Sequence, residues 1–261
     1  MKGLGDILGV PGRTFGTWSQ IHSPELIDML GLNGFDFIVI DCQHGPFGIE
    51  TAERMARAAA ASGLAAAVRV SRLDEVEILK ALDSGISHVI VPDVASAAEA
   101  GRAVAATRFA PHGTRGACPC VRSGGHFVRD WRDYAAREEA RTGVVALVES
   151  VDGMGEIEAI AATPGLAALM AGPFDLSVSM GLGGDWRAAP VREALRRLVA
   201  AGRERGLPVV MPVFSPDPVE CRDLVENWAE EGVSCFMLGS DKILIANAFG
   251  QWIDSVADRT T

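Results

Sequence analysis

Two carboxylates that follow long apolar runs are the first residues in this chain that could do chemistry. Glu149 comes directly after the run at 144–148, and Asp175 comes after the run at 169–174. Carboxylates that converge on one pocket repel each other unless a proton, a cation or an arginine separates them. A hard divalent cation, which prefers oxygen ligands, would offset the repulsion between the two carboxylates, so the pair predicts a metal site. The alternative is that both carboxylates form structural salt bridges with Arg69.

An arginine, an aspartate and a histidine accompany these carboxylates at the ends of other apolar runs. Arg69 lies between two valines, and a guanidinium buried there without a partner would be too costly. Asp41 and His44 follow another run, and the alternative for them is that they only end a strand and cap the next helix. Carboxylates, a histidine and an arginine on separate strand ends together form a catalytic constellation.

A lysine in the pocket would offer a different chemistry, the formation of a Schiff base with a carbonyl substrate. The chain has three lysines, which are Lys2, Lys80 and Lys242. Lys2 is terminal, Lys80 lies in an outer helical segment, and Lys242 follows the last apolar run. Because no lysine lies within a strand, the sequence favours a metal over an imine.

Eight short apolar runs are expected to be the strands that position these residues. They are rich in Val, Ile, Leu and Phe without strict alternation, which is typical of parallel strands buried on both faces. The runs cover residues 14–19, 35–42, 64–70, 88–94, 144–149, 166–172, 207–214 and 235–239. Amphipathic segments separate them, as at 24–32, 75–82, 97–108 and 218–231.

This alternation predicts an α/β fold, a closed (β/α)8 TIM barrel that forms one domain over residues 1–261. In such a barrel, polar residues at the carboxyl ends of the strands face the active site, and Trp18 is among them. A doubly wound open sheet is the alternative, but it would need a glycine-rich fingerprint after its first strand. No such segment follows the run at 14–19.

The bulk composition narrows the class of protein. The formal net charge is −10, and clustered basic residues suited to nucleic acid are absent, so we expect no nucleic-acid partner. No apolar stretch approaches the length of a membrane span or a signal peptide. Five cysteines without a recognisable pattern indicate reduced thiols and a cytoplasmic location.

Several segments resemble the HpcH/HpaI aldolases, the class II pyruvate aldolases that include 4-hydroxy-2-oxoheptanedioate aldolase. Residues 35–45 resemble the signature of their second strand, and Val68-Arg69-Val70 is similar to their third. Residues 82–85 and 107–116 resemble the turn before strand 4 and the long loop after it. Residues 148–150 and 172–177 are similar to the two strands that carry their metal ligands. The resemblance extends in order over nearly the whole chain.

The resemblance implies a role for each polar residue of the constellation. Glu149 and Asp175 would bind Mg²⁺ or Mn²⁺, with Co²⁺ a further candidate, and pyruvate would chelate that ion. Arg69 would stabilise the enolate oxygen. His44 would be the base, directly or through a metal-bound water. Asp83 would raise the basicity of His44, from a neighbouring subunit or its own, with Asp41 close by.

The resemblance also implies where pyruvate binds. Main-chain amides near Phe174 and Asp175 would hold its carboxylate, so that the substrate-binding residues are Trp18, Arg69, Gly172, Pro173, Phe174 and Asp175. Three positions depart from the family pattern. Leu147 stands where many members have Gln, Gln43 stands where some have Glu, and Phe174 occupies a position that is often Ala. These departures affect the choice of substrate more than the reaction.

The function expected from these residues is that of a metal-dependent aldolase, a carbon–carbon lyase. It would reversibly cleave 4-hydroxy-2-oxo acids to pyruvate and an aldehyde through a metal-stabilised pyruvate enolate. Two alternatives stay open: a related lyase or decarboxylase acting on oxaloacetate-like 2-oxo acids, and a barrel that only binds a small acid. The insert at 121–132 either forms part of the aldehyde pocket or is a surface loop.

The last helical segment, at 243–256, is more apolar than one face toward a barrel requires. The resemblance implies that this helix is exchanged with, or packs on, a partner subunit. It further implies a homo-oligomer, with a hexamer built as a trimer of dimers.

Overall fold

The computed structural model describes residues 3–257, in which eight parallel strands close into a barrel. Each strand pairs with the next one along the chain, and β8 pairs with β1. The strands are β1 (Thr14–Ser19), β2 (Phe37–Asp41), β3 (Ala65–Arg69), β4 (His88–Val91), β5 (Gly143–Val148), β6 (Leu166–Ala171), β7 (Val209–Val213) and β8 (Cys235–Ser240). The predicted (β/α)8 barrel is therefore confirmed, and the expected runs match the strands to within a few residues.

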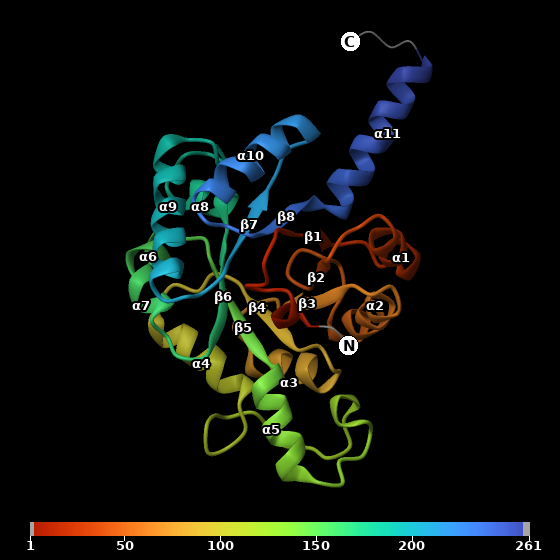
Figure 1. Ribbon diagram of the computed structural model, residues 1–261, viewed down its shortest axis with the longest axis vertical. Coiled ribbons are helices and arrows are strands. Elements are labelled where there is room, and N and C mark those ends of the chain that lie inside the picture. The colour runs from red at the N-terminus through yellow and green to blue at the C-terminus, as the bar shows by residue number, and fades with distance from the viewer. Residues whose placement is uncertain (1–2, 258–261) are drawn as a thin grey trace.

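Helices surround the barrel on its outside (Figure 1). They are α1 (Pro24–Leu32), α2 (Ile49–Ala61), α3 (Glu75–Asp83), α4 (Ala97–Thr107), α5 (Trp131–Arg141), α6 (Val151–Gly155), α7 (Ile157–Ala161), α8 (Pro173–Ser179), α9 (Ala189–Glu204), α10 (Pro218–Glu230) and α11 (Asp241–Ala257). Two short 3₁₀ turns, η1 (Leu4–Asp6) and η2 (Arg122–Gly124), complete the elements.

Burial on both faces explains why the strands read as continuous apolar runs. In β5, Val145 and Leu147 point into the barrel, and Val144, Ala146 and Val148 pack against the helices. All five side chains are buried. Parallel strands covered by helices on one face and by the barrel interior on the other have no face left for polar residues until they end. The polar side chains therefore appear where β5 stops, at Glu149.

Polar side chains cap the first turns of three helices, α1, α3 and α10. The Ser23 hydroxyl accepts the Leu26 amide at 3.2 Å, and the Asp74 carboxylate accepts the Val76 amide at 2.9 Å. The Asp217 carboxylate accepts the amide of Val219 at 2.8 Å in the same way. These bonds satisfy amides that have no partner within the helix. They fix where each loop at the carboxyl end of the barrel becomes a helix.

The amino-terminal turn η1 closes the opposite end of the barrel. Leu4 is fully buried and joins the cluster in the barrel interior, and Gly3 forms a bridge with Ala66 of β3. This turn could not be predicted from the sequence, because three residues carry no periodicity. With this end filled, a substrate can reach the interior only from the carboxyl ends of the strands.

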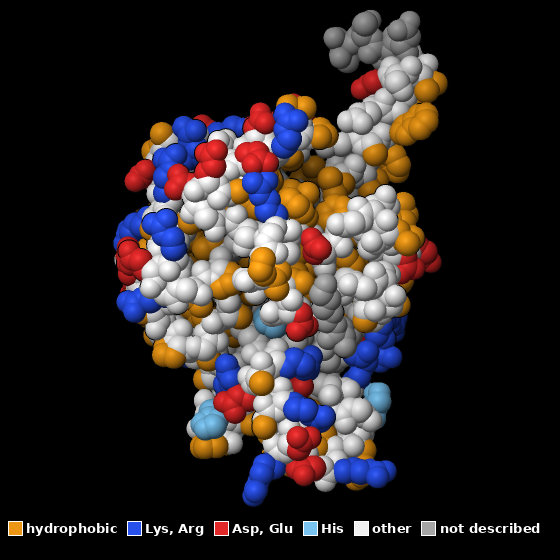
Figure 2. Space-filling view, in the orientation of Figure 1, with side chains coloured by type: hydrophobic (Ala, Val, Ile, Leu, Met, Phe, Trp, Pro, Cys, Tyr) orange, Lys and Arg blue, Asp and Glu red, His pale blue; other side chains and the backbone are white. Residues whose placement is uncertain are grey.

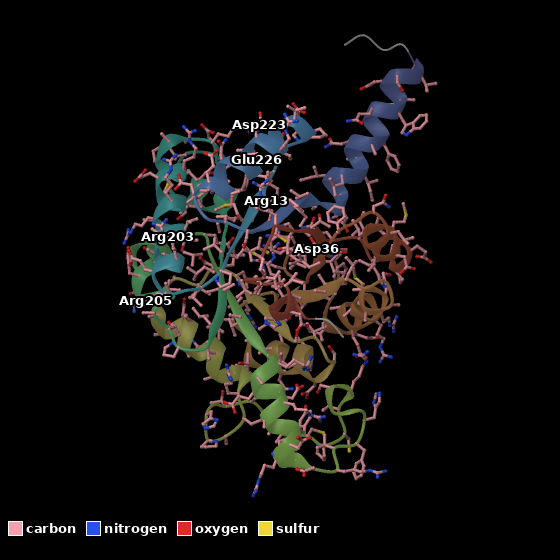
Figure 3. All side chains as sticks on the ribbon, viewed as in Figure 1. Arg13, Asp36, Arg203, Arg205, Asp223 and Glu226 are labelled. Carbon is pink, nitrogen blue, oxygen red and sulfur yellow. The ribbon has the colours of Figure 1, made fainter. Side chains whose placement is uncertain are left out.

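Side chains at the start of β1 connect it to its neighbours. The Arg13 guanidinium donates two hydrogen bonds to the Glu226 carboxylate of α10, at 2.6 and 2.7 Å (Figure 3). The Asp36 carboxylate accepts the Phe15 amide at 2.8 Å.

The basic residues of α9 lie on its outer side, where Arg197 pairs with Glu158, so they form a solvated face.

Helix α11 extends away from the barrel instead of lying along it (Figure 1). Apolar side chains cover much of this helix (Figure 2), and its exposed large ones are Leu244, Phe249, Trp252, Ile253 and Val256. Trp252 is 72% exposed, and Val256 is 74% exposed. Within residues 3–257, no helix combines the length and the apolar character that a membrane crossing requires. An apolar helix that leaves its own barrel is the expected form of an element that packs on another subunit.

We predict that the protein is a homo-oligomer held by α11, with a hexamer of three dimers as the expected state. Phe249→Asp together with Trp252→Asp places charges on the exposed apolar surface, where their burial in an interface is costly. Light scattering coupled to gel filtration should show a hexamer for the unmodified protein and smaller species for the variant. A stable monomer of the unmodified protein at micromolar concentration would contradict this.

Candidate active site

A cavity of about 450 Å³ opens at the carboxyl ends of the strands. Eight of the residues predicted to act on substrate line it: Trp18, His44, Arg69, Glu149, Gly172, Pro173, Phe174 and Asp175. They come from β1, β3 and the segments that follow β2, β5 and β6. The closure of the barrel brings these distant parts of the chain together, as the strand-end rule predicts.

Arg69 is held rigidly at the side of this cavity. Its Nε donates to Asp41 Oδ1 at 2.8 Å, and its Nη2 donates to Asp41 Oδ2 at 2.6 Å. Its Cζ lies 4.1 Å from the centre of the Trp18 ring, a cation–π contact. A two-point bond and a stacking surface together leave a guanidinium almost no freedom, so Arg69 is fixed before any ligand arrives.

Asp41 lies behind Arg69 and is fully buried. Burial alone would raise the pKa of the Asp41 carboxyl. The hydrogen bonds and the charge of Arg69 outweigh burial and lower this pKa, and a hydrogen bond from Gln20 Nε2 at 2.7 Å adds to their effect. Asp41 Oδ1 also accepts the main-chain amides of Gln43 and His44. Asp41 therefore positions both Arg69 and the loop that carries His44. It does not line the cavity, whereas Gln20, which the sequence did not single out, does.

Glu149 and Asp175 face the same cavity from the ends of β5 and β6. Burial, together with repulsion from the Asp175 carboxylate, raises the pKa of Glu149 to about 7. Glu149 Oε1 accepts the main-chain amide of Asp93 at 2.9 Å. Asp93 holds a left-handed conformation, with φ of 48°, that is uncommon for a residue other than glycine. The segment after β4 therefore adopts a strained turn that directs an N–H at Glu149.

Gly172 lets the two carboxylates come together. A Cβ at this position would lie 2.3 Å from Glu149 Cβ and 2.6 Å from its Oε2, which is closer than atoms can approach. A larger residue would displace Glu149 from the cavity. The first turn of α8 follows directly and carries Asp175. The segment from Gly172 to Asp175 is thus shaped by the need to hold Glu149 and Asp175 beside each other.

The donor set fits a hard divalent cation. Two carboxylates face one cavity, and the pKa of Glu149 shows that they repel each other in the absence of positive charge. Within residues 3–257, no group of three or more His, Cys, Asp or Glu side chains could hold a metal. Two protein ligands are too few for a structural zinc site but are typical of Mg²⁺, which keeps several waters and takes further oxygens from substrate.

His44 and Asp83 lie at different ends of the barrel. His44 follows β2 at the carboxyl end, and its imidazole is exposed to the cavity without a hydrogen-bond partner in the described part of the chain. Asp83 is the last residue of α3, which runs back toward the amino end, and its Oδ1 accepts Arg115 Nη2 at 3.0 Å. Burial raises the pKa of Asp83 despite this pairing. Within one chain, Asp83 therefore cannot reach His44.

Two other groups weighed from the sequence lie away from the cavity. Neither Lys80 nor Lys242 lines it, and Lys2 lies outside the described residues. The insert at 121–132 packs near the end of α3, where Arg122 Nη1 donates to the Ser84 carbonyl at 2.6 Å. This insert is thus remote from the cavity of its own chain.

Comparison with known proteins agrees with this fold and site. The family model described as HpcH/HpaI aldolase/citrate lyase matches residues 14–256. The chain is 32% identical over 226 residues to a 5-keto-4-deoxy-D-glucarate aldolase from Klebsiella pneumoniae, covering 87% of this chain and 85% of that protein. It is 35% identical over 248 residues to a hydroxypyruvate/pyruvate aldolase from Paraburkholderia phytofirmans, covering 93% and 92%.

A solved structure gives the same result at the level of the fold. The crystal structure of an HpcH/HpaI aldolase/citrate lyase family protein from Burkholderia cenocepacia J2315 superimposes with a TM-score of 0.86 at 31% identity. That match covers 94% of this chain and 95% of the other. The chain belongs to the HpcH/HpaI aldolase/citrate lyase family, whose aldolases are carbon–carbon lyases.

Replacement of Arg69 by lysine should separate its charge from its geometry. Arg69→Lys keeps a cation but loses the two-point bond to Asp41 and the stacking on Trp18. We expect kcat for cleavage to fall by roughly 10²–10³-fold, as for the loss of one oriented donor to a developing oxyanion. Metal affinity, measured by calorimetry, should change little because Glu149 and Asp175 remain. Near-normal turnover would remove Arg69 from the mechanism.

The raised pKa of Glu149 predicts how stability depends on pH when no metal is added. The folded protein holds this proton to a higher pH than the unfolded chain does. The stabilising contribution is therefore present at low pH and is lost as the pH rises through about 7. The Tm of the metal-free protein should fall by a few degrees between pH 5 and pH 8 relative to that of Glu149→Gln, which cannot titrate.

Added Mg²⁺ should reverse this loss, because the ion binds the ionised carboxylate. The increase in Tm on adding Mg²⁺ should be larger at pH 8 than at pH 6 and small in Glu149→Gln. Identical pH profiles for the two metal-free proteins would show that Glu149 does not titrate in this range.

Proposed function

We propose that this protein is a metal-dependent aldolase that reversibly cleaves 4-hydroxy-2-oxo acids into pyruvate and an aldehyde. The observation that carries the proposal is the placement of a fixed guanidinium, Arg69, in the same cavity as the carboxylates Glu149 and Asp175. Cleavage leaves negative charge on the keto oxygen of pyruvate, so an oriented cation is the group that the reaction needs. The names of the two aldolase relatives support the same reaction class.

Glu149 and Asp175 would hold the ion, with Mg²⁺ and Mn²⁺ as the expected metals. When bound there, the ion withdraws electron density from the keto group of the substrate and offsets the repulsion between the two carboxylates. Positive charge held there would also favour the ionised form of Glu149 at neutral pH, because a cation beside a carboxylate lowers its pKa.

The chain's own residues would carry the proton and orient the substrate. In the cleavage direction, His44 removes the proton of the 4-hydroxyl group, and the bond between C3 and C4 breaks as the aldehyde forms. The electron pair of that bond passes into the enolate, whose oxygen accepts hydrogen bonds from Arg69. A proton then returns to C3 and completes the methyl group of pyruvate. Main-chain amides at Phe174 and Asp175 would hold the pyruvate carboxylate.

Asp83 fits this scheme only as a group from a neighbouring subunit, since it lies at the far end of its own barrel from His44. A carboxylate beside the imidazole would favour the protonated histidine and so raise its basicity. The proposed oligomer is therefore part of the proposed active site. Asp83→Asn should lower activity without altering the cavity of its own chain.

Proton exchange between pyruvate and solvent tests the proposal without knowledge of the aldehyde. In deuterated buffer with Mg²⁺ or Mn²⁺, the enzyme should exchange the methyl protons of pyruvate, and a chelator should stop the exchange. Glu149→Ala and Asp175→Ala remove ligands, and His44→Ala removes the base, so each should slow the exchange by about 10²-fold or more. Proton NMR measures the rate directly.

Two controls make the exchange experiment specific. His112→Ala removes an exposed histidine that pairs with Glu139 outside the cavity, and it should leave the rate unchanged. Borohydride added with pyruvate should trap no adduct, because no described lysine lines the cavity. Exchange that survives thorough metal removal, or a trapped adduct on Lys80 or Lys242, would overturn the mechanism.

A further inference from the structure

One side of the active-site cavity is built from apolar side chains to which the proposed chemistry gives no role. Pro212 and Phe214 come from the end of β7, Trp186 from the segment before α9, and Ile243 from the first turn of α11. Leu147 lies below them, in the apolar cluster of the barrel interior. In an eight-stranded barrel, β7 is diametrically across from β3, so this apolar wall faces Arg69.

Trp186 is held in the wall by a chain of contacts of its own. The Arg187 Cζ lies 4.0 Å from the centre of the Trp186 ring. The same guanidinium donates to Glu220 Oε1 from Nε at 3.0 Å and from Nη2 at 2.7 Å. Glu220 in turn accepts the hydroxyl of Ser215. The indole is therefore a preformed surface, and little conformational entropy is lost when a ligand binds against it.

Phe174 extends the apolar surface from the side of the metal ligands. It is 52% exposed in the cavity, and a Cβ added at Gly184 would lie 3.0 Å from its Cε2. Gly184 has φ of 89°, so the segment before Trp186 turns close beside this ring in a conformation that suits glycine. The wall thus joins two aromatic side chains through one glycine turn.

A second carboxylate would find no free arginine or lysine among the described residues of this chain that line the cavity. Among the described residues that line it, Arg69 is the one arginine or lysine, and Asp41 already matches its charge. The remaining acidic groups, Glu149 and Asp175, are negative themselves. A carboxylate moved from water to an apolar wall without a cation loses far more hydration free energy than it recovers. A chain of hydroxyls would likewise find few donors, since the Gln20 amide is bonded to Asp41.

We propose that the aldehyde used by this enzyme carries an apolar substituent of aromatic size, and that the Trp186 wall binds it. This inference rests on the proposed aldolase function and names the substrate class for that same site. Arg69 and the metal ligands hold the pyruvate half, and the cavity of about 450 Å³ is far larger than pyruvate requires. The substituent of the aldehyde therefore occupies the space against Trp186 and Phe214.

The test is a comparison of aldehydes in aldol addition with the assembled, Mg²⁺-loaded enzyme. In this direction, the pyruvate methyl group loses a proton, its carbon bonds to the aldehyde carbon, and the aldehyde oxygen gains a proton. Benzaldehyde and 4-carboxybenzaldehyde differ by one carboxylate on the same ring, and glyceraldehyde tests a short polyhydroxyl chain. We expect kcat/KM for benzaldehyde to exceed that for each of the other two by at least about 10-fold.

Variants of the wall connect this preference to the residues. Trp186→Ala should lower kcat/KM for benzaldehyde by about 10-fold or more and so reduce its ratio to kcat/KM for glyceraldehyde, whereas Trp186→Phe should keep most of the preference. Phe214→Ala is a second, independent variant with the same expected pattern. Equal or better use of 4-carboxybenzaldehyde by the unmodified enzyme overturns the inference, and so does a preference that both alanine variants retain.

The exchange assay separates the two levels of the proposal. Normal metal-dependent exchange of pyruvate protons without an apolar preference would leave the aldolase function standing and overturn this inference alone. Absence of exchange in the metal-loaded, unmodified enzyme would overturn the proposed function and the inference with it.

Discussion

The ion pair between Arg69 and Asp41 is the interaction on which the rest of the site depends. Both side chains are buried, and a buried charge is tolerated only when its partner and its remaining hydrogen-bonding groups are satisfied. Here Asp41 receives bonds from Arg69, from Gln20 and from two amides of the following loop. One carboxylate therefore fixes a guanidinium from β3 and the loop that carries His44. Loss of Asp41 would leave Arg69 without its partner and the His44 loop without its anchor.

The second constraint is the unfavourable proximity of Glu149 and Asp175. The charge of Arg69 offsets only part of this repulsion, because the hydrogen bonds of its guanidinium go to Asp41. Gly172 and the strained turn at Asp93 both serve to keep Glu149 in place, and both go against ordinary backbone or packing preferences. Backbone strain and two neighbouring carboxylates at the same place are characteristic of a site that is completed by a ligand. In the proposed function, a divalent cation would supply the missing positive charge.

The sequence predicts the barrel and most of the site for one physical reason. Parallel strands buried on both faces are apolar until they end, and closure brings every carboxyl end to one rim. The placement of Glu149, Asp175, Arg69 and His44 around one cavity could therefore be predicted from position alone. The supporting residues could not be assigned in this way. Gln20 and Asp93 act through a single hydrogen bond each, which depends on loop conformation. Asp83 lies at the other end of its own barrel from His44, and its proposed contact with the His44 of a neighbouring subunit depends on how subunits pack.

The apolar wall was missed for a different reason. Trp186 and Phe214 lie in segments after β6 and β7 whose apolar residues have no periodicity, so nothing in the sequence distinguishes a wall residue from a residue that packs in the core. The departure at Leu147 was visible, but its consequence depends on which side chains face it across the barrel. Long loops at the carboxyl end of a barrel are where such binding surfaces are built. The sequence shows which residues these loops contain, but only the structure shows which side chains face the cavity.

The two halves of the cavity are supported by separate sets of contacts, and this separation bears on how substrate choice and chemistry are related. Arg69 is held by Asp41, Gln20 and Trp18, whereas Trp186 is held by Arg187, Glu220 and Ser215. No residue belongs to both sets. Changes at sites that share no partner usually have additive effects. We therefore expect changes in the segment before α9 and in the loop after β7 to alter the proposed aldehyde preference, while the half proposed to form the enolate stays the same.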